Sequence, residues 1–162
     1  MRRLCLTLLC GLVAVPAALA ASYATGDGVL EISNGAGNIV LNTTRGTVWG
    51  QVARGRLVVT DPVPGDGAVY VSGAEAVPVA ENVTSYRGKD LHFRVTSGKV
   101  KLALKGFGID LTAVGVGTVQ LTGDAYAADP GLYALDNNGK WNPLPVSSTK
   151  TVSFGVPSAP AP

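Results

Sequence analysis

Few residues in this sequence could supply nucleophilic or metal chemistry. The chain has a single histidine, His92, and its cysteines, Cys5 and Cys10, both lie near the N-terminus. His92 alternates with Leu91 and Phe93, so we expect it at an exposed strand position and not beside a nucleophile as a general base. A zinc site needs several His or Cys ligands, and no Gly-x-Ser-x-Gly motif is present. The sequence therefore predicts no catalytic, cofactor-binding or metal-binding residues and no enzyme.

Paired carboxylates are the remaining route to hydrolysis, since a glycosidase needs only two acids about 5–10 Å apart. Most of the 11 Asp and Glu residues stand in predicted turns, where Asp bonds to the local backbone. Glu31, Asp90 and Asp110 fall on predicted strands, and alternation places them on the outward face. A carboxylate-dependent hydrolase is therefore the less favoured alternative.

Basic residues concentrate between residues 87 and 105. The segment contains one acidic residue, Asp90, and six basic residues. The basic residues are Arg87, Lys89, Arg94, Lys99, Lys101 and Lys105. A solvated sheet edge protected by lysines is the commoner explanation of such a run. Like charges on paired strands cost stability, however, so these six are also a candidate anion-binding surface for cell-wall polymers or lipid headgroups. No aromatic residue interleaves the charges on the solvent-facing side of this segment, which makes nucleic acid a less favoured partner.

Two aromatic residues, Trp49 and Tyr70, alternate with inward-facing valines and are expected on the outer face of a sheet. Exposed aromatic rings on a sheet can stack on sugars, so Trp49 and Tyr70 are candidate sugar-stacking residues. A second layer packed over that face is the commoner explanation. A carbohydrate-binding module is therefore the alternative to a structural role or an anion-binding role.

Strands must position all these side chains. Apolar residues alternate at period two between turn residues, and the chain holds 21 Gly and 10 Pro among its 162 residues. Only segment 74–82 resembles a short helix, and Pro78 interrupts it. Glycines recur at roughly ten-residue spacing, which fits either a meander of hairpins or a β-solenoid.

The turns favour hairpins. If Ser97-Gly98 is a two-residue loop, Phe93 lies opposite Leu102. Three further loops keep apolar residues on one face in the same way, and they are Asn34–Gly37, Arg54-Gly55 and Gly115–Gly117. A fifth, at Asp136–Gly139, joins strand 132–135 to 140–141. We therefore predict an all-β fold, an antiparallel hairpin meander forming a sandwich or a barrel, with a β-solenoid as the alternative.

The same alternation predicts the core. The inward positions are apolar and of medium to large volume, and they are Leu30, Ile32, Ile39, Leu41, Leu57, Val59, Phe93, Val95, Leu102, Ile109, Leu111, Val119 and Leu121.

The first twenty residues resemble a secretory signal peptide. A basic start at Arg2 and Arg3 precedes an apolar run over 4–15 and an A-x-A cleavage site at 18–20. The run is too short for a transmembrane anchor, and ordinary secretion is favoured over twin-arginine export. Removing 1–20 leaves 11 basic and 11 acidic residues and no cysteine, so the mature chain is neutral and free of disulfides.

We expect three segments: signal peptide 1–20, one all-β domain over 21–155, and a Pro- and Ala-rich disordered tail over 156–162. The domain is expected outside the cell, secreted or associated with the cell wall.

Several runs of the domain carry a resemblance. They include Gly88–Val95, Gly98–Leu102, Gly106–Val119, and Tyr133–Leu135 followed by Gly139–Pro145. Together they resemble a group of small, uncharacterised secreted all-β proteins of actinobacteria. The resemblance spans most of the mature chain and implies secretion and an all-β fold, and it brings no catalytic residues with it.

Overall fold

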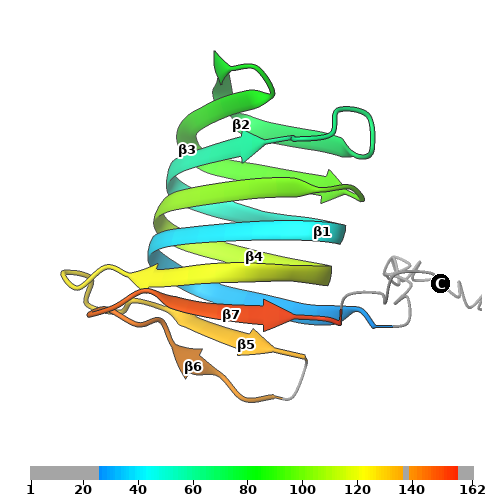
Figure 1. Ribbon diagram of the computed structural model, residues 1–162. Helices are drawn as coiled ribbons and strands as arrows, with labels where there is room; N and C mark the ends of the chain where they lie inside the picture. Colours follow the sequence, from blue (N-terminus) through cyan, green and yellow to red (C-terminus); the bar gives the residue numbers. More distant parts are fainter. Residues whose placement is uncertain (1–25, 137–138, 157–162) are drawn as a thin grey trace, which may run out of the picture.

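The computed structural model describes residues 26–136 and 139–156, and there the chain is all-strand and antiparallel (Figure 1). Its strands are β1 (Gly28–Thr60), β2 (Ala68–Ala80), β3 (Val83–Thr96), β4 (Val100–Gly123), β5 (Leu132–Leu135), β6 (Asn142–Pro143) and β7 (Lys150–Phe154). The main order is β2-β3-β1-β4-β7, with β5 pairing with β1 and β6. The predicted all-β antiparallel class is confirmed. The helix considered at 74–82 is wrong, because β2 runs through 74–80 as a strand.

The predicted signal peptide, 1–20, lies outside the described residues, as does the tail from 157 onward.

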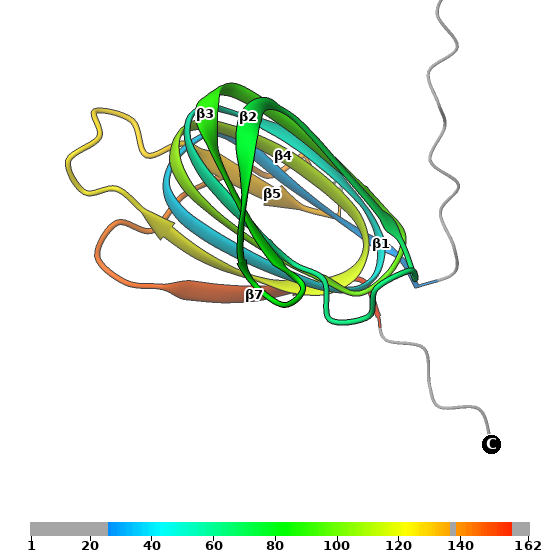
Figure 2. The same ribbon diagram turned by 90° about the horizontal axis from the view of Figure 1, so that it is seen from above.

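The long strands wind back and forth between two layers of one open, sandwich-like sheet. Residues 37–43 of β1 pair with two stretches of β4 at once, 100–106 on one side and 117–123 on the other. Residues 28–35 and 46–52 of β1 both flank 109–115 of β4. Seen from above, β1, β3 and β4 curve round a flattened coil (Figure 2).

We name the two layers of this coil A and B. Layer A contains 37–43 and 54–60 of β1, 100–106 and 117–123 of β4, 83–88 of β3, 74–80 of β2, and β7. Layer B contains 28–35 and 46–52 of β1, 109–115 of β4, 91–96 of β3, 68–72 of β2, and β5.

Glycines stand where the strands cross from one layer to the other. At one edge of the coil Gly55 pairs with both Gly88 and Gly106, and at the other edge Gly115 pairs with Gly46. A Cβ on Gly55 would lie 2.9 Å from the Gly106 Cα, which is closer than real Cβ atoms approach backbone. Neighbouring windings can therefore bend together only where side chains are absent.

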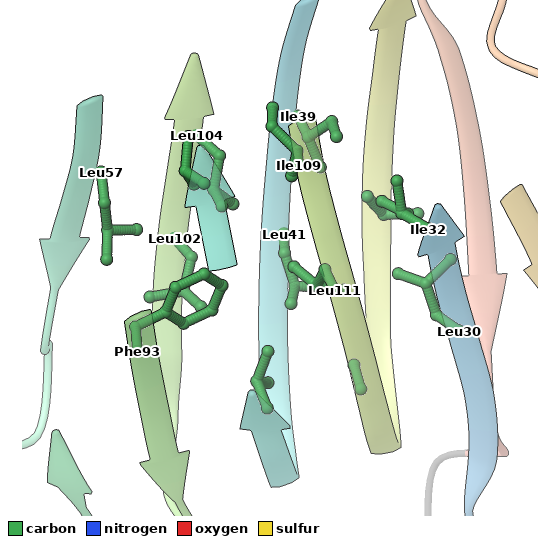
Figure 3. Close-up of a cluster of buried hydrophobic side chains, with 14 of the residues drawn as sticks. Leu30, Ile32, Ile39, Leu41, Leu57, Phe93, Leu102, Leu104, Ile109 and Leu111 are labelled. Atoms are coloured by element: carbon green, nitrogen blue, oxygen red, sulfur yellow. The ribbon is translucent and has the colours of Figure 1, made fainter. Parts of the chain in front are cut away.

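The core lies between the layers. Every residue of the predicted core is buried, so the assignment of the inward face is confirmed. Figure 3 shows Phe93 of layer B beside Leu102 and Leu57 of layer A, with Leu41 and Leu111 further along the same interior. The same cluster includes buried residues that the sequence reasoning did not select, and they are Val48, Val52, Leu91, Val100, Leu104, Ala113, Tyr133, Leu144 and Phe154.

Four of the five predicted hairpin turns are wrong. Strands β3 and β4 do not pair with each other across Ser97-Gly98; Phe93 pairs with Gly50 and Val71, and Leu102 with Leu41 and Val59. The loops expected at Asn34–Gly37, Arg54-Gly55 and Gly115–Gly117 lie within β1 or β4. At these points the chain passes into the opposite layer instead of reversing within one.

The fifth turn joins the expected elements. Strand β5 pairs with β6, Tyr133 opposite Asn142, across the loop that contains Asp136 and Gly139. The returning strand begins at Asn142, slightly later than the sequence predicted.

Candidate functional site

The outer face of layer A carries a row of three cations on three neighbouring strands. Arg87 of β3 pairs with Arg56 of β1, and Arg56 pairs with Lys105 of β4. Adjacent strands lie about 4.8 Å apart, so the backbone positions of the row span about 10 Å. The Arg56 Nε donates a hydrogen bond to the Ser85 Oγ (2.9 Å), which fixes the guanidinium at the middle of the row.

Two further cations stand at the adjoining bend, where Arg54 of β1 pairs with Lys89 of β3. We define the cation patch as Arg54, Arg56, Arg87, Lys89 and Lys105. Glu75 lies opposite Arg87 in the register and Asp90 follows Lys89 in the chain. Yet within the described residues no member of the cation patch forms an ion pair. Its positive charge is therefore left largely to solvent and to any ligand.

The structure divides the six basic residues singled out in the sequence. Arg87, Lys89 and Lys105 lie in the cation patch, and Lys101 lies on the same face beside Thr60 and Asn42. A hairpin turning at Ser97-Gly98 would have placed Arg94 opposite Lys101, two like charges on paired strands; instead Arg94 lies on layer B, opposite Trp49 and Tyr70, and that pairing is wrong. Lys99 stands at the β3–β4 turn, where its backbone N–H donates to the Asp66 Oδ2 (2.9 Å).

Sequence reasoning missed Arg54 and Arg56. Alternation with the buried Leu57 and Val59 places Arg56 on the outward face, which the sequence does indicate. What the sequence did not indicate is that β3 and β4 flank this part of β1 and bring Arg87 and Lys105 to either side of it.

A shallow hollow of about 320 Å³ adjoins Lys105 at the glycine-rich bend. Its walls include Asn38, Phe107, Thr122 and Asp124. Phe107 is 52% exposed and pairs in register with Arg54, so one aromatic ring does accompany the cations. The prediction that no aromatic residue would stand among the charges is wrong for the folded chain.

The outer face of layer B carries the two aromatic candidates in one cross-strand row. Tyr70 of β2 pairs with Arg94 of β3, and Arg94 pairs with Trp49 of β1. Tyr70 is 63% exposed and Trp49 38% exposed. The second layer that could have covered both rings is not formed by the described residues.

Beside Trp49 the same face is hollowed by about 400 Å³. The polar side chains in its wall belong to Gln51, His92, Asp110 and Thr112. The Gln51 Nε2 donates to the Asp110 Oδ2 (2.8 Å), and the Asn34 N–H donates to the Asp110 Oδ1 (2.8 Å). Asp110 is thus held by two donors, and Gln51 keeps its amide oxygen as an acceptor.

The outward carboxylates are dispersed. Asp110 pairs in register with Gln51, Glu31 pairs with Thr112 and Ala134, and Asp90 stands at a bend with a φ of +54°. Among residues 26–136 and 139–156, no group of three or more His, Cys, Asp or Glu side chains could hold a metal ion.

Comparison with protein-family models, with curated proteins and with solved structures finds no match to this chain. The resemblance seen in the sequence therefore stays a prediction. In the part of the chain that the structure describes, no helix is long and apolar enough to cross a membrane.

Proposed function

We propose that this chain is a secreted, non-catalytic β domain that binds an anionic cell-wall polymer at the cell exterior through the cation patch. The observation that carries the proposal is the row Arg87–Arg56–Lys105, three like charges on adjacent strands, none of which forms an ion pair in the described residues.

The energetics of the sheet support this proposal. Like charges directly opposite one another on paired strands destabilise a sheet, and here two such pairs follow in succession. Glu75 opposite Arg87 offsets part of this cost at one end of the row, but Arg56 and Lys105 have no carboxylate opposite them in the register of the described strands. A ligand with regularly repeated negative charges would turn the remaining repulsion into attraction. Arg54 and Lys89, the two cations at the bend, extend the positive potential of the row toward the hollow beside Lys105.

The mature chain also carries no excess positive charge, because its 11 basic residues balance its 11 acidic residues once residues 1–20 are removed. A protein of this kind does not attract polyanions through net charge. Attraction has to come from a local concentration of cations such as the cation patch.

The test uses inorganic polyphosphate and two variants with equal charge loss. Arg87→Gln/Lys105→Gln removes both ends of the row, and Lys99→Gln/Lys140→Gln removes two exposed cations elsewhere. We expect the first variant to bind polyphosphate about tenfold or more weakly than the parent and the second to bind like the parent. Parent binding should weaken steeply with salt, because exposed charges are screened within about 8 Å at physiological ionic strength.

Equal binding by the parent and Arg87→Gln/Lys105→Gln would overturn the proposal. Two further probes identify the class of anion. Tighter binding of single-stranded DNA that is lost in Phe107→Ala would replace the wall polymer with nucleic acid, since base stacking needs the ring. Binding confined to phosphatidylglycerol vesicles would replace it with lipid headgroups.

A further inference from the structure

We infer that the outer face of layer B is a second binding site, one for a sugar chain that carries a carboxylate. The inference does not depend on the cation patch, which lies on layer A. It rests on the row Tyr70–Arg94–Trp49 and on the hollow beside it.

The row places a guanidinium between two exposed aromatic rings. Tyr70 and Trp49 stand two strands apart, with backbone positions separated by about 9.6 Å, and Arg94 occupies the strand between them. This arrangement matches an extended sugar chain in which two sugar rings lie on aromatic faces and an acidic group lies between. Aromatic rings offer a large, rigid contact area at a low cost in conformational entropy.

The positive and negative side chains on this face are separated. Arg94 forms no ion pair with any residue that the structure describes, while the carboxylates, Asp110 and Glu31, stand beyond Trp49 on β4 and on the first part of β1. A ligand carboxylate is therefore directed to Arg94, whose planar guanidinium can bind both of its oxygens.

The hollow supplies the hydrogen bonding that sugar hydroxyls need. Gln51 is oriented by its bond to Asp110 and keeps an amide oxygen to accept a hydroxyl proton. The Thr112 hydroxyl and the His92 imidazole stand in the same wall. A few polar groups beside apolar ring faces are the usual composition of a small-molecule site.

The shape of the hollow depends on Gly50, which follows Trp49 in β1 and forms part of the wall. Gly50 pairs with Phe93 on one side and with Leu111 on the other. A Cβ there would clash with the Asp110 backbone carbonyl oxygen and would lie 2.9 Å from the Phe93 Cζ. Any larger residue would displace the β4 backbone at Asp110 and the Phe93 ring, and so deform the wall that Trp49, Gln51 and His92 share.

The test compares an oligogalacturonate with an uncharged glucan oligosaccharide of the same length, titrated calorimetrically into the full domain. We expect the parent to bind the oligogalacturonate more tightly. Trp49→Ala should lose about tenfold or more in affinity for both probes, and Arg94→Gln should lose only the preference for the acid. Trp141→Ala, which removes a ring that is 43% exposed elsewhere, should bind like the parent.

Two results would overturn the inference, provided that circular dichroism shows each variant folded. One is unchanged oligogalacturonate affinity in Trp49→Ala, and the other is an unchanged acid preference in Arg94→Gln. Loss of oligogalacturonate binding in Arg87→Gln/Lys105→Gln, with Trp49→Ala binding normally, would place the sugar on the cation patch. That result would overturn this inference and leave the proposed function standing, whereas failure with polyphosphate alone would overturn only the proposed function.

Discussion

Phe93 and Phe107 show how far burial decides what one phenylalanine contributes. Phe93 is 4% exposed and packs inside the cluster shared by both layers, whereas Phe107 is 52% exposed at the bend beside Arg54. The two side chains are chemically identical, so they form a matched pair for substitution.

Phe93→Ala should lower the free energy of unfolding by about 3–5 kcal/mol, because it removes buried apolar surface and leaves a cavity that the two layers cannot close. Phe107→Ala should change it by less than about 0.5 kcal/mol. Urea titration of both variants measures the difference. A Phe93→Ala protein as stable as the parent would show that the ring is not packed between the layers.

The cation row makes a prediction about stability as well as binding. Lys105→Gln relieves the like-charge pair with Arg56 and removes no cross-strand carboxylate partner, because Lys105 pairs only with Arg56 and Asn38 among the described residues. It should therefore raise the free energy of unfolding by about 0.2–1 kcal/mol at low salt. The gain should shrink as salt is added, because salt already screens the repulsion. Thermal melts at two ionic strengths test this, and a variant less stable than the parent at low salt would contradict it.

The elements of this fold are long strands that bend, and their bends explain both the successes and the errors of the sequence reasoning. Side chains alternate across a strand whether the chain reverses in a hairpin or crosses into the opposite layer. Both routes leave Leu30, Ile32, Ile39 and Leu41 facing inward, so the inward face could be predicted.

The pairing of the strands could not be predicted from that alternation. Nothing local in Arg54-Gly55 distinguishes a turn between two paired strands from a bend within β1. The partners of this bend, Gly88 and Gly106, lie far along the chain, and only the complete coil brings the three glycines together. The candidate sites were affected in the same way. Tyr70 and Trp49 were correctly expected on an outer face, but Arg94 was grouped with the other basic residues of 87–105, whereas it lies between these two rings on layer B.

Substitution at a bend tests the coil directly. Gly55→Ala should destabilise the domain by about 1–3 kcal/mol or more, because its Cβ meets the backbone of Lys105 and Gly106, which cannot rotate away as a side chain could. Calorimetric unfolding of this variant gives the measurement. A midpoint equal to the parent's would mean that the windings are further apart at this edge than the structure places them.

At the scale of the whole molecule, the coil has a protected middle and two open ends. Residues 37–43 of β1 have partners on both sides, whereas among the described residues β2 pairs only with β3. Because β1 pairs along its length with β4, far along the chain, most contacts join residues distant in sequence, a topology that favours slow folding. Stability is therefore expected to be graded along the coil and not uniform.

Hydrogen exchange should reveal this gradient. Amides of residues 39–42, bonded within the middle of layer A, should exchange only through global unfolding, while amides of β2 should exchange through local opening with much lower protection. Pro78 within β2 also interrupts its ladder, as is common for an edge strand. If β2 proved as protected as the middle of β1, its free edge would have to be covered in solution. Sedimentation would then show whether a second copy of the chain covers it, since an exposed strand edge can pair with another strand.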